Sequence, residues 1–255
     1  MKIALPQSLI NTPLAHRGLH DAAKGRIENA MASFRAAIDA GYGIELDVQL
    51  SADAQAMSFH DDTLDRLTSE VGFVRERTSR ELGTIRLNGT DDTIPMFRDV
   101  LDLVAGQVPL LVEIKDQDGA FGDGVGPLER AVARDLQDYR GDCAVMSFNP
   151  HSVAAMQALL PRTARGITTE GFEPEPEGIS REVLDGLRDI DAYDRVGASF
   201  ISHDRNDLDR LRVMELKAQG ARVLCWTVRS RQEETQARKV AENITFEGYL
   251  PALAG

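Results

Sequence analysis

Cysteine is scarce in this 255-residue chain, and its two cysteines, Cys143 and Cys225, stand far apart in apolar runs. Neither belongs to a Cys-x-x-Cys pair, so the pattern favours buried thiols over a disulfide framework, a zinc site or a redox motif. We therefore expect a reducing compartment. The first residues, MKIALPQS, also lack the apolar run of a signal peptide. Together these features predict a cytoplasmic protein.

Long apolar runs and clusters of basic residues are missing as well. No stretch approaches the ~20 apolar residues of a membrane span, which argues against membrane insertion. The formal net charge is -12, with 29 Lys and Arg against 41 Asp and Glu. Because nucleic-acid binding depends on neutralising phosphates with cations, we expect no nucleic-acid partner. The acidity predicts solubility, and the sequence leaves the oligomeric state open.

Short apolar runs alternate with amphipathic segments along most of the chain. The apolar runs are residues 14–16, 44–48, 110–115, 144–148, 164–167, 198–202, 223–228 and 244–249. The amphipathic segments are residues 29–40, 95–104, 128–139, 152–160, 182–190, 208–218 and 231–241. This alternation predicts parallel strands covered by helices, and its length fits a closed (β/α)₈ TIM barrel. A doubly wound open sheet is the alternative, but no G-x-G-x-x-G follows the first strand.

One segment, residues 51–93, interrupts the alternation because it contains no long amphipathic helix. It predicts a short strand at residues 56–60, then turns, and a one-turn helix at residues 79–82. We interpret it as a small insertion after the second strand. The chain is then a single barrel domain over residues 1–255.

Carboxylates occupy strand positions where apolar residues are expected. Glu45 and Asp47 alternate within GIELDV, and Glu113 precedes Lys115 by two residues in LVEIK. Side chains two apart in a strand point the same way, and parallel barrels build their sites at the carboxyl ends of strands. Three carboxylates meeting there would repel one another without a cation, and oxygen ligands favour Mg²⁺ or Ca²⁺. The alternative is that these acids end in solvent or pair with Lys115 and Arg17.

Histidine is rare, yet two of the five end predicted strands beside these acids. His16 lies in LAHRG and His60 in MSFHDD, which suits a general acid and a general base. Arg17 and Lys115 add positive charge to the same rim. A cation, two fixed positive charges and two imidazoles together suit a phosphate ester. A serine nucleophile is not favoured, because no G-x-S-x-G occurs and Ser147 has no obvious base.

Several motifs in order give the chain a resemblance to a known family. They are AHRG, ENAMASFRAAIDAG, IELDVQLSADAQAMSFHDDTLDRLT, IPMFRDVL, LLVEIK, SFNPHSVAAM and VLCWTV. By these motifs the chain resembles the glycerophosphodiester phosphodiesterase family over nearly its whole length. It departs from the family at Ile27, Ala30 and residues 53–55, and in ENITFEGYLP, where the family has G-V-D-G-I-I-T-D-x-P. We expect these departures to lie outside the catalytic set.

The resemblance implies a TIM barrel that hydrolyses glycerophosphodiesters, with one divalent cation, to sn-glycerol 3-phosphate and an alcohol. Matched position by position, the family's functional residues fall into four groups. They are the metal ligands Glu45, Asp47 and Glu113, the acid and base His16 and His60, the phosphate-contacting Arg17 and Lys115, and Trp226 on the glycerol side. Trp226 has barrel-core packing as its alternative role. Glu28 and Asn29 match a motif expected to cap the first helix and brace the site.

Two other functions stay open. A lysophospholipase D or sphingomyelinase D-like enzyme would need an apolar groove, whereas the loop ITTEGFEPEPEGIS is acidic, with Phe172 as its one apolar tip. That loop favours a soluble small-molecule substrate. A non-catalytic phosphodiester-binding barrel would be expected to lose a histidine or a metal acid, and this chain keeps all five. The sequence does not say which histidine is the acid, or whether water attacks directly or a cyclic phosphate forms first.

Overall fold

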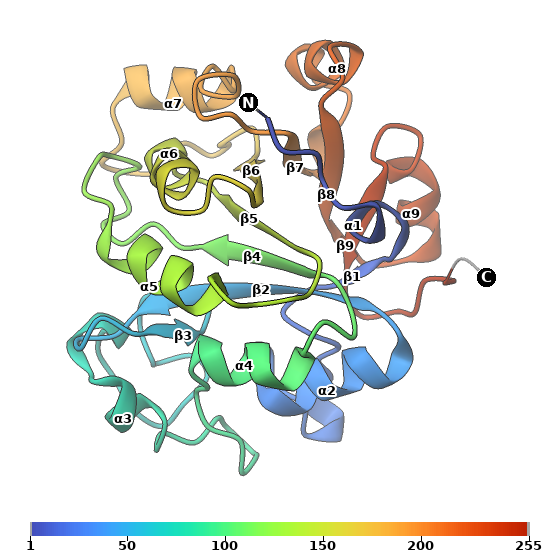
Figure 1. Ribbon diagram of the computed structural model, residues 1–255. Helices are drawn as coiled ribbons and strands as arrows, with labels where there is room; N and C mark the ends of the chain where they lie inside the picture. Colours follow the sequence, from blue (N-terminus) through green and yellow to red (C-terminus); the bar gives the residue numbers. More distant parts are fainter. Residues whose placement is uncertain (1, 254–255) are drawn as a thin grey trace.

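The computed structural model describes residues 2–253, and within them eight parallel strands close into a barrel (Figure 1). These are β1 (Leu14–Ala15), β2 (Gly43–Leu50), β4 (Leu110–Ile114), β5 (Cys143–Ser147), β6 (Ala164–Thr169), β7 (Phe200–Asp204), β8 (Arg222–Val228) and β9 (Asn243–Phe246). Each strand pairs with the next, and β1 pairs with both β2 and β9, which closes the ring. The predicted (β/α)₈ barrel is confirmed.

Helices lie outside the barrel and connect successive strands (Figure 1). They are α2 (Met31–Ala40), α4 (Phe97–Val104), α5 (Pro127–Leu136), α6 (Pro150–Leu159), α7 (Arg181–Arg188), α8 (Leu211–Ala218) and α9 (Arg231–Ala237). Each overlaps a predicted amphipathic segment. Side-chain caps explain several starts, since Asn149, Ser180 and Ser230 accept hydrogen bonds from the first turns of α6, α7 and α9.

Hydrophobic side chains form one layer between barrel and helices and another inside the barrel. The inner layer contains Leu5, Leu9, Leu14, Leu111, Ala144, Met146, Ala164, Phe200 and Leu224. It leaves no room at Gly166, where an added Cβ would lie 2.4 Å from the Phe200 ring. The barrel interior is therefore a packed core, and a site can form only at its rim.

Helix α1 (Gln7–Asn11) precedes the first strand and was not expected from the sequence. Leu5 and Leu9 join the inner layer, so this segment packs against the amino-terminal end of the barrel. Asn243, at the start of β9, donates from Nδ2 to the carbonyl oxygens of Leu9 at 2.9 Å and Thr12 at 2.6 Å. A five-residue helix is too short to produce a recognisable 3.6-residue period.

The predicted insertion after β2 is confirmed. It contains β3 (Ala56–Ser58), which runs antiparallel to β2, the 3₁₀ turn η2 (Val74–Glu76) and α3 (Ser79–Leu82). It has its own small core, formed by Ile27, Ala30, Met57, Phe59, Leu64, Val74, Leu82, Leu87 and Ile94. Two further 3₁₀ turns are η1 (Ala22–Lys24) and η3 (Arg205–Asp207). Across residues 2–253, none of the helices combines the length and the apolar character needed to cross a bilayer.

Candidate active site

Three predicted carboxylates meet at the carboxyl end of the barrel. Glu45 and Asp47 lie on β2, and Asp47 is in register with Glu113 on β4. One carboxylate oxygen from each lies within 4.8 Å of those from the other two. The exposed fractions are only 3% for Glu45, 2% for Asp47 and 7% for Glu113. The strands therefore bring together three buried acids that can hold a metal ion.

The electrostatics of this triad favour a bound cation. Burial, with the charges of Asp47 and Glu113, raises the pKa of Glu45 well above its ordinary value. Burial also opposes ionisation of Asp47, but Lys115, His60 and Arg17 outweigh it and lower the pKa of Asp47. The triad thus resists carrying all three negative charges at once. An ion with a preference for oxygen ligands, such as Mg²⁺ or Ca²⁺, relieves that repulsion.

Two cationic side chains lie against the triad, as the sequence predicts. Lys115 Nζ lies 2.7 Å from Glu113 Oε1 and 3.4 Å from Asp47 Oδ1. Arg17 Nε lies 3.4 Å from Asp47 Oδ2, and this buried nitrogen has no hydrogen-bond partner within the described residues. An unpaired buried N–H is costly, so Arg17 has donor capacity left for an anionic ligand.

The backbone around Arg17 is held in an unusual conformation. Arg17 and Gly18 have φ values of +53° and +80°. A Cβ at Gly18 would lie 2.6 Å from Ser33 Oγ, so this turn requires glycine. The turn directs the backbone N–H of Arg17 to Glu45 Oε2 at 3.1 Å. Arg17 thus contacts the acids with both its backbone and its side chain.

Asn29 braces the acids, but it does not cap the first helix as expected. Helix α2 begins after Ala30, whose side chain cannot cap it, and Asp92 Oδ2 accepts from the Ala32 backbone N–H at 3.2 Å instead. Instead Asn29 Nδ2 donates to Asp47 Oδ2 at 2.9 Å, and Asn29 Oδ1 accepts from the Asp47 backbone N–H at 3.1 Å. Two bonds between one pair of residues fix the Asp47 carboxylate relative to β2.

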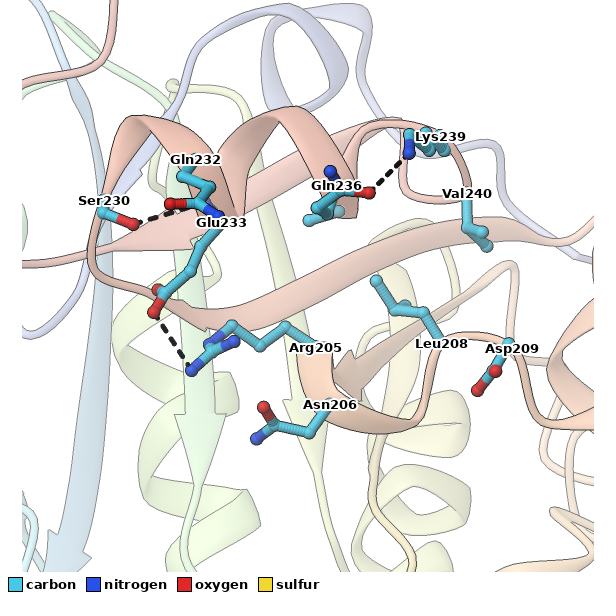
Figure 2. A pocket seen from close by; sticks show the side chains of 11 residues that line it. Arg205, Asn206, Leu208, Asp209, Ser230, Gln232, Glu233, Gln236, Lys239 and Val240 are labelled. Atoms are coloured by element: carbon cyan, nitrogen blue, oxygen red, sulfur yellow. Dashed lines mark hydrogen bonds and ion pairs between the residues drawn. The ribbon is translucent and has the colours of Figure 1, made fainter.

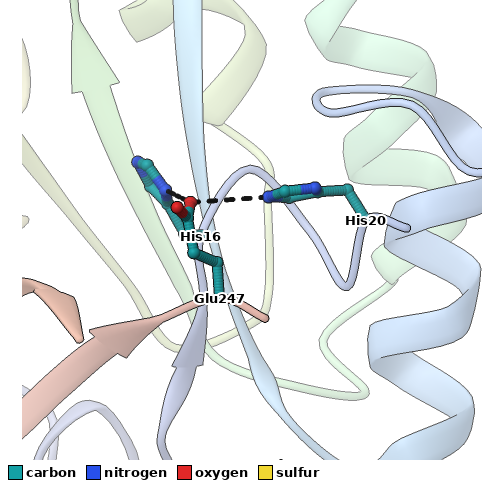
Figure 3. A group of neighbouring side chains, drawn as sticks. All are labelled: His16, His20 and Glu247. Carbon is teal, nitrogen blue, oxygen red and sulfur yellow. Dashed lines mark hydrogen bonds and ion pairs between the residues drawn. The ribbon is translucent and has the colours of Figure 1, made fainter. Parts of the chain in front are cut away.

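Each predicted catalytic histidine has a carboxylate at Nδ1. His16 Nδ1 lies 2.6 Å from Glu247 Oε2 (Figure 3), and His60 Nδ1 lies 2.7 Å from Asp61 Oδ1. Both rings line the same cavity as the triad. With Nδ1 engaged, Nε2 is the nitrogen free to exchange a proton with a ligand. Burial lowers the pKa of His16 despite the hydrogen bond to Glu247.

A chain of ion pairs connects His60 to Arg17. Arg66 donates to Asp61 Oδ2 at 2.6 Å from Nε and to Glu28 Oε1 at 2.7 Å from Nη2. Glu28 Oε1 also accepts from Arg17 Nη1 at 2.6 Å. Burial raises the pKa of Glu28, but Arg66 and Arg17 outweigh it and bring that pKa to about 2. Glu28 is therefore ionised throughout the neutral range.

The cavity between these groups is small, about 50 Å³. Its lining comprises His16, Arg17, Glu45, Asp47, His60, Glu113, Lys115, Met146, Phe148, Trp226 and Thr245. Every predicted site residue is included. Trp226 Nε1 donates to the Ser202 carbonyl at 3.0 Å, and the Phe148 ring packs edge-on at 5.6 Å. Trp226 and Phe148 thus form an apolar part of the cavity wall.

A larger cavity of about 590 Å³ lies between η3 and α9 (Figure 2). It contains none of the predicted site residues. Two of its charged groups pair with each other, since Arg205 Nη2 lies 3.2 Å from Glu233 Oε1, and Lys239 donates to the amide oxygen of Gln236. The small cavity therefore holds the carboxylates, imidazoles and cationic groups that could carry out chemistry, and this larger cavity does not.

Sequence reasoning missed three of the residues that contact the histidines or their partners. Asp61 and Arg66 lie within the quoted HDDTLDR motif, which held the signal for them. Glu247 lies in ENITFEGYLP, which we expected to be outside the catalytic set. The structure places Glu247 in contact with His16, so this departure adjoins the predicted catalytic set. The departure from the family pattern concealed a carboxylate at the site.

Comparisons with known proteins identify the same family that the sequence motifs resemble. A family model described as "Glycerophosphoryl diester phosphodiesterase family" matches residues 16–243. The chain belongs to this family. As a glycerophosphoryl diester phosphodiesterase family member, it is classed with the phosphoric diester hydrolases.

Sequence relatives cover most of the chain. YhdW of Bacillus subtilis, which is named as a glycerophosphodiester phosphodiesterase, is 28% identical to this chain over 228 residues. The aligned region covers 86% of each protein. A glycerophosphodiester phosphodiesterase of Caldanaerobacter subterraneus is 30% identical over 173 residues, covering 64% of this chain and 68% of that protein.

Solved structures confirm the fold. A phosphodiesterase from Oleispira antarctica, in complex with the product sn-glycerol-3-phosphate, has a TM-score of 0.74 at 22% identity. The match covers 92% of this chain and 91% of that one. The barrel architecture is thus common to both proteins.

Proposed function

We propose that this family member hydrolyses glycerophosphodiesters to sn-glycerol 3-phosphate and an alcohol with the help of one divalent cation. The main support is that one cavity contains three buried carboxylates, with ligand atoms within 4.8 Å of one another, and two histidines that each contact a carboxylate. The glycerol 3-phosphate bound as product in the Oleispira antarctica phosphodiesterase supports this substrate class.

Glu45, Asp47 and Glu113 are the residues proposed to hold the cation. Their donor set is entirely oxygen, and the raised pKa of Glu45 reflects a surplus of negative charge in a buried place. Both features fit Mg²⁺ or Ca²⁺ better than a metal that prefers sulfur or nitrogen. When bound, such an ion supplies Lewis-acid stabilisation of phosphate oxygens.

Arg17 and Lys115 are proposed to bind the phosphate. Burial disfavours the charge on Lys115, but Glu113 and Asp47 outweigh it and raise the pKa of Lys115, so this amine stays protonated. Positive groups fixed in a water-poor cavity stabilise charge that builds on phosphate oxygens during displacement. Trp226 would then contact the glycerol carbons from the apolar wall.

His16 and His60 are proposed to move the protons. One imidazole takes a proton from the attacking oxygen, and the other gives one to the leaving alkoxide. Their Nδ1 atoms are engaged by Glu247 and Asp61, which leaves both Nε2 atoms for the substrate. A well-placed acid or base contributes roughly 10²–10⁴-fold to the rate.

A lipid substrate is less compatible with the site. The cavity measures about 50 Å³. Phe172, the residue expected to be an apolar loop tip, is 5% exposed and packs with Leu184 and Leu187. That side chain therefore offers no exposed contact for an acyl chain. Faster turnover of lysophosphatidylcholine than of glycerophosphocholine would reverse this ranking.

The proposed function is tested with a panel of glycerophosphodiesters assayed in EDTA and after adding Mg²⁺, Ca²⁺ or Mn²⁺. We expect release of sn-glycerol 3-phosphate that EDTA abolishes and a divalent ion restores. His16→Ala and His60→Ala should still bind a diester but lose turnover. Binding without turnover by the unaltered protein would instead support a non-catalytic barrel.

A further inference from the structure

Glu247 lies directly after β9, at the end of the barrel where the triad lies. Its backbone N–H donates to the Val228 carbonyl at 3.0 Å, which continues the pairing of β9 with β8. The side chain is only 20% exposed. The position of Glu247 is therefore set by barrel closure and not by a loose terminal segment.

The two oxygens of Glu247 have different partners. Oε2 lies 2.6 Å from His16 Nδ1, and Oε1 accepts from Arg229 Nε at 2.7 Å. Figure 3 shows the carboxylate between the rings of His16 and His20, and His20 Nε2 lies 3.6 Å from Oε2. Because Arg229 holds one oxygen, the other is kept in a fixed direction toward His16.

We infer that Glu247 is a positioning residue that accepts the Nδ1 proton of His16 and so keeps Nε2 as the unprotonated nitrogen facing the cavity. A carboxylate at Nδ1 selects the tautomer and the orientation of an imidazole without itself reacting. The hydrogen bond to His16 is also the largest cause of the lowered pKa of Glu247, which keeps this acceptor ionised. The inference rests on the proposed function, because it assigns Glu247 a part in the same site.

The second histidine has the same arrangement, built from different residues. His60 Nδ1 faces Asp61, and Arg66 holds Asp61 as Arg229 holds Glu247. Asp61 adjoins His60 in the sequence, whereas Glu247 lies 231 positions from His16. The recurrence of a histidine, a carboxylate and an arginine on both sides of the cavity supports a positioning role.

A second cation site is the rival explanation for this cluster. Ligand atoms of His16, His20 and Glu247 do lie within 4.8 Å of one another. However, 2.6 Å between Nδ1 and Oε2 is the length of a charge-assisted hydrogen bond. A metal ion bound by both atoms would lie about 2.0–2.2 Å from Nδ1 and from Oε2. The two ligand atoms would then have to be farther apart than they are. The geometry favours a shared proton.

The test compares Glu247→Gln, Glu247→Ala and Glu247→Asp with the unaltered protein. Glutamine removes the charge and cannot serve both Nδ1–H and Arg229, since it has only one acceptor oxygen. We expect kcat to fall about 10–100-fold in the Gln and Ala variants, the usual scale for losing a hydrogen bond that orients a functional imidazole. KM should change little, and aspartate should restore part of kcat.

Glu242→Gln is the matched control. Glu242 precedes β9 and is also 20% exposed, with Lys217 Nζ at 2.6 Å, but it does not line the site cavity. We expect its kcat to equal that of the unaltered protein. Equal kcat losses in the Glu242 and Glu247 variants would show a structural effect and overturn the inference.

Nitrogen-15 NMR of the histidine rings gives a readout that does not depend on activity. We expect His16 to carry its proton at Nδ1 in the unaltered protein and to become a tautomer mixture in Glu247→Ala. An unchanged His16 tautomer would overturn the inference even if the proposed hydrolysis is observed. If the tautomer responds but no diester is hydrolysed, the proposed function fails and the positioning contact stands.

His20→Ala separates positioning from metal binding. We expect it to keep kcat within about twofold, because His20 lies beyond normal hydrogen-bond length from Glu247. Loss of Zn²⁺ binding and of kcat together in His20→Ala would favour the cation site and overturn the positioning role.

Discussion

At the scale of single residues, the site depends on backbone conformations that few residues adopt. Arg17, Gly18 and Asn29 all have positive φ, at +53°, +80° and +57°. Such conformations cost of order 1–3 kcal/mol for a non-glycine residue. They place a backbone N–H on Glu45 and an amide on Asp47. Strain here gives the acids fixed donors.

Gly18→Ala should damage stability and activity together. A Cβ would lie 2.6 Å from Ser33 Oγ and 2.9 Å from the Ser33 carbonyl carbon, so the turn must move and Arg17 with it. We expect about 2–4 kcal/mol less free energy of unfolding in urea, and kcat at least about tenfold lower. Gly25→Ala is the control, because its φ is +68° but nothing lies within 4 Å of the added Cβ. Equal effects at both positions would contradict this explanation.

Glu28 should make stability depend on acid pH. Its pKa falls from 4.5 to about 2 on folding, so its contribution is complete above pH 4.5 and is lost as pH falls toward 2. Allowing for solvent screening, we expect the free energy of unfolding of the unaltered protein to be about 1–2 kcal/mol larger than that of Glu28→Gln at pH 6. That difference in the free energy of unfolding should shrink between pH 4.5 and 3. A difference that stays constant over this range would contradict the assignment.

At the scale of elements, short helices and strands close the barrel and supply site residues, although their length gives little sequence signal. Helix α1 closes the amino-terminal end of the barrel, although it has only five residues. The insertion around β3 and α3 supplies His60 and, through Asp61 and Arg66, its anchoring partners. These elements are defined by the surfaces they cover and not by their own periodicity.

Leu9→Ala tests the closing role of α1. Leu9 is fully buried in the inner layer, so truncation removes apolar burial and leaves a cavity. We expect a loss of about 2–5 kcal/mol in the free energy of unfolding, with kcat unchanged at temperatures where the variant is folded. Leu211→Ala, at a position 73% exposed, should cost less than about 0.5 kcal/mol. Similar losses for both variants would show that α1 does not close a core.

At the scale of the whole molecule, charge is distributed unevenly. The chain carries a net charge of -12, yet the triad region places Arg17, Arg66 and Lys115 among its acids. Pairing of β2 with β4 buries carboxylates that repel one another. The folded protein is therefore expected to bind a cation at the carboxyl end of the barrel. A ligand that binds only the folded chain stabilises it by mass action.

A divalent cation should therefore raise the melting temperature. At a concentration 100 times its Kd, one bound ion adds about 2.7 kcal/mol to the free energy of unfolding. Glu45→Gln should abolish this increase, whereas Glu129→Gln should keep it, since Glu129 is also buried but bonds Ser152 and the Gly126 backbone. Differential scanning calorimetry with Mg²⁺ or Ca²⁺, against K⁺ at matched ionic strength, gives the measurement. An equal rise in Glu45→Gln would place the ion elsewhere.

The sequence by itself determined the barrel and its insertion, and it predicted the eight residues that line the small cavity. Strand and helix periods are local, and the motifs around His16, His60 and Glu113 lie within short segments. Alternation with period two then predicted that Glu45 and Asp47 share one side of β2.

Only the tertiary structure decided which distant groups complete the site. Glu247 reaches His16 because β9 pairs with β1 when the barrel closes, and no local pattern encodes a contact 231 positions long. Asn29 lies beside Asp47 instead of capping α2 because the buried Asp47 carboxylate needs donors, whereas Asp92 Oδ2 accepts from the Ala32 backbone N–H at the start of α2. Propensity acts between neighbours in the chain, whereas ring closure and the desolvation of charge act between neighbours in space.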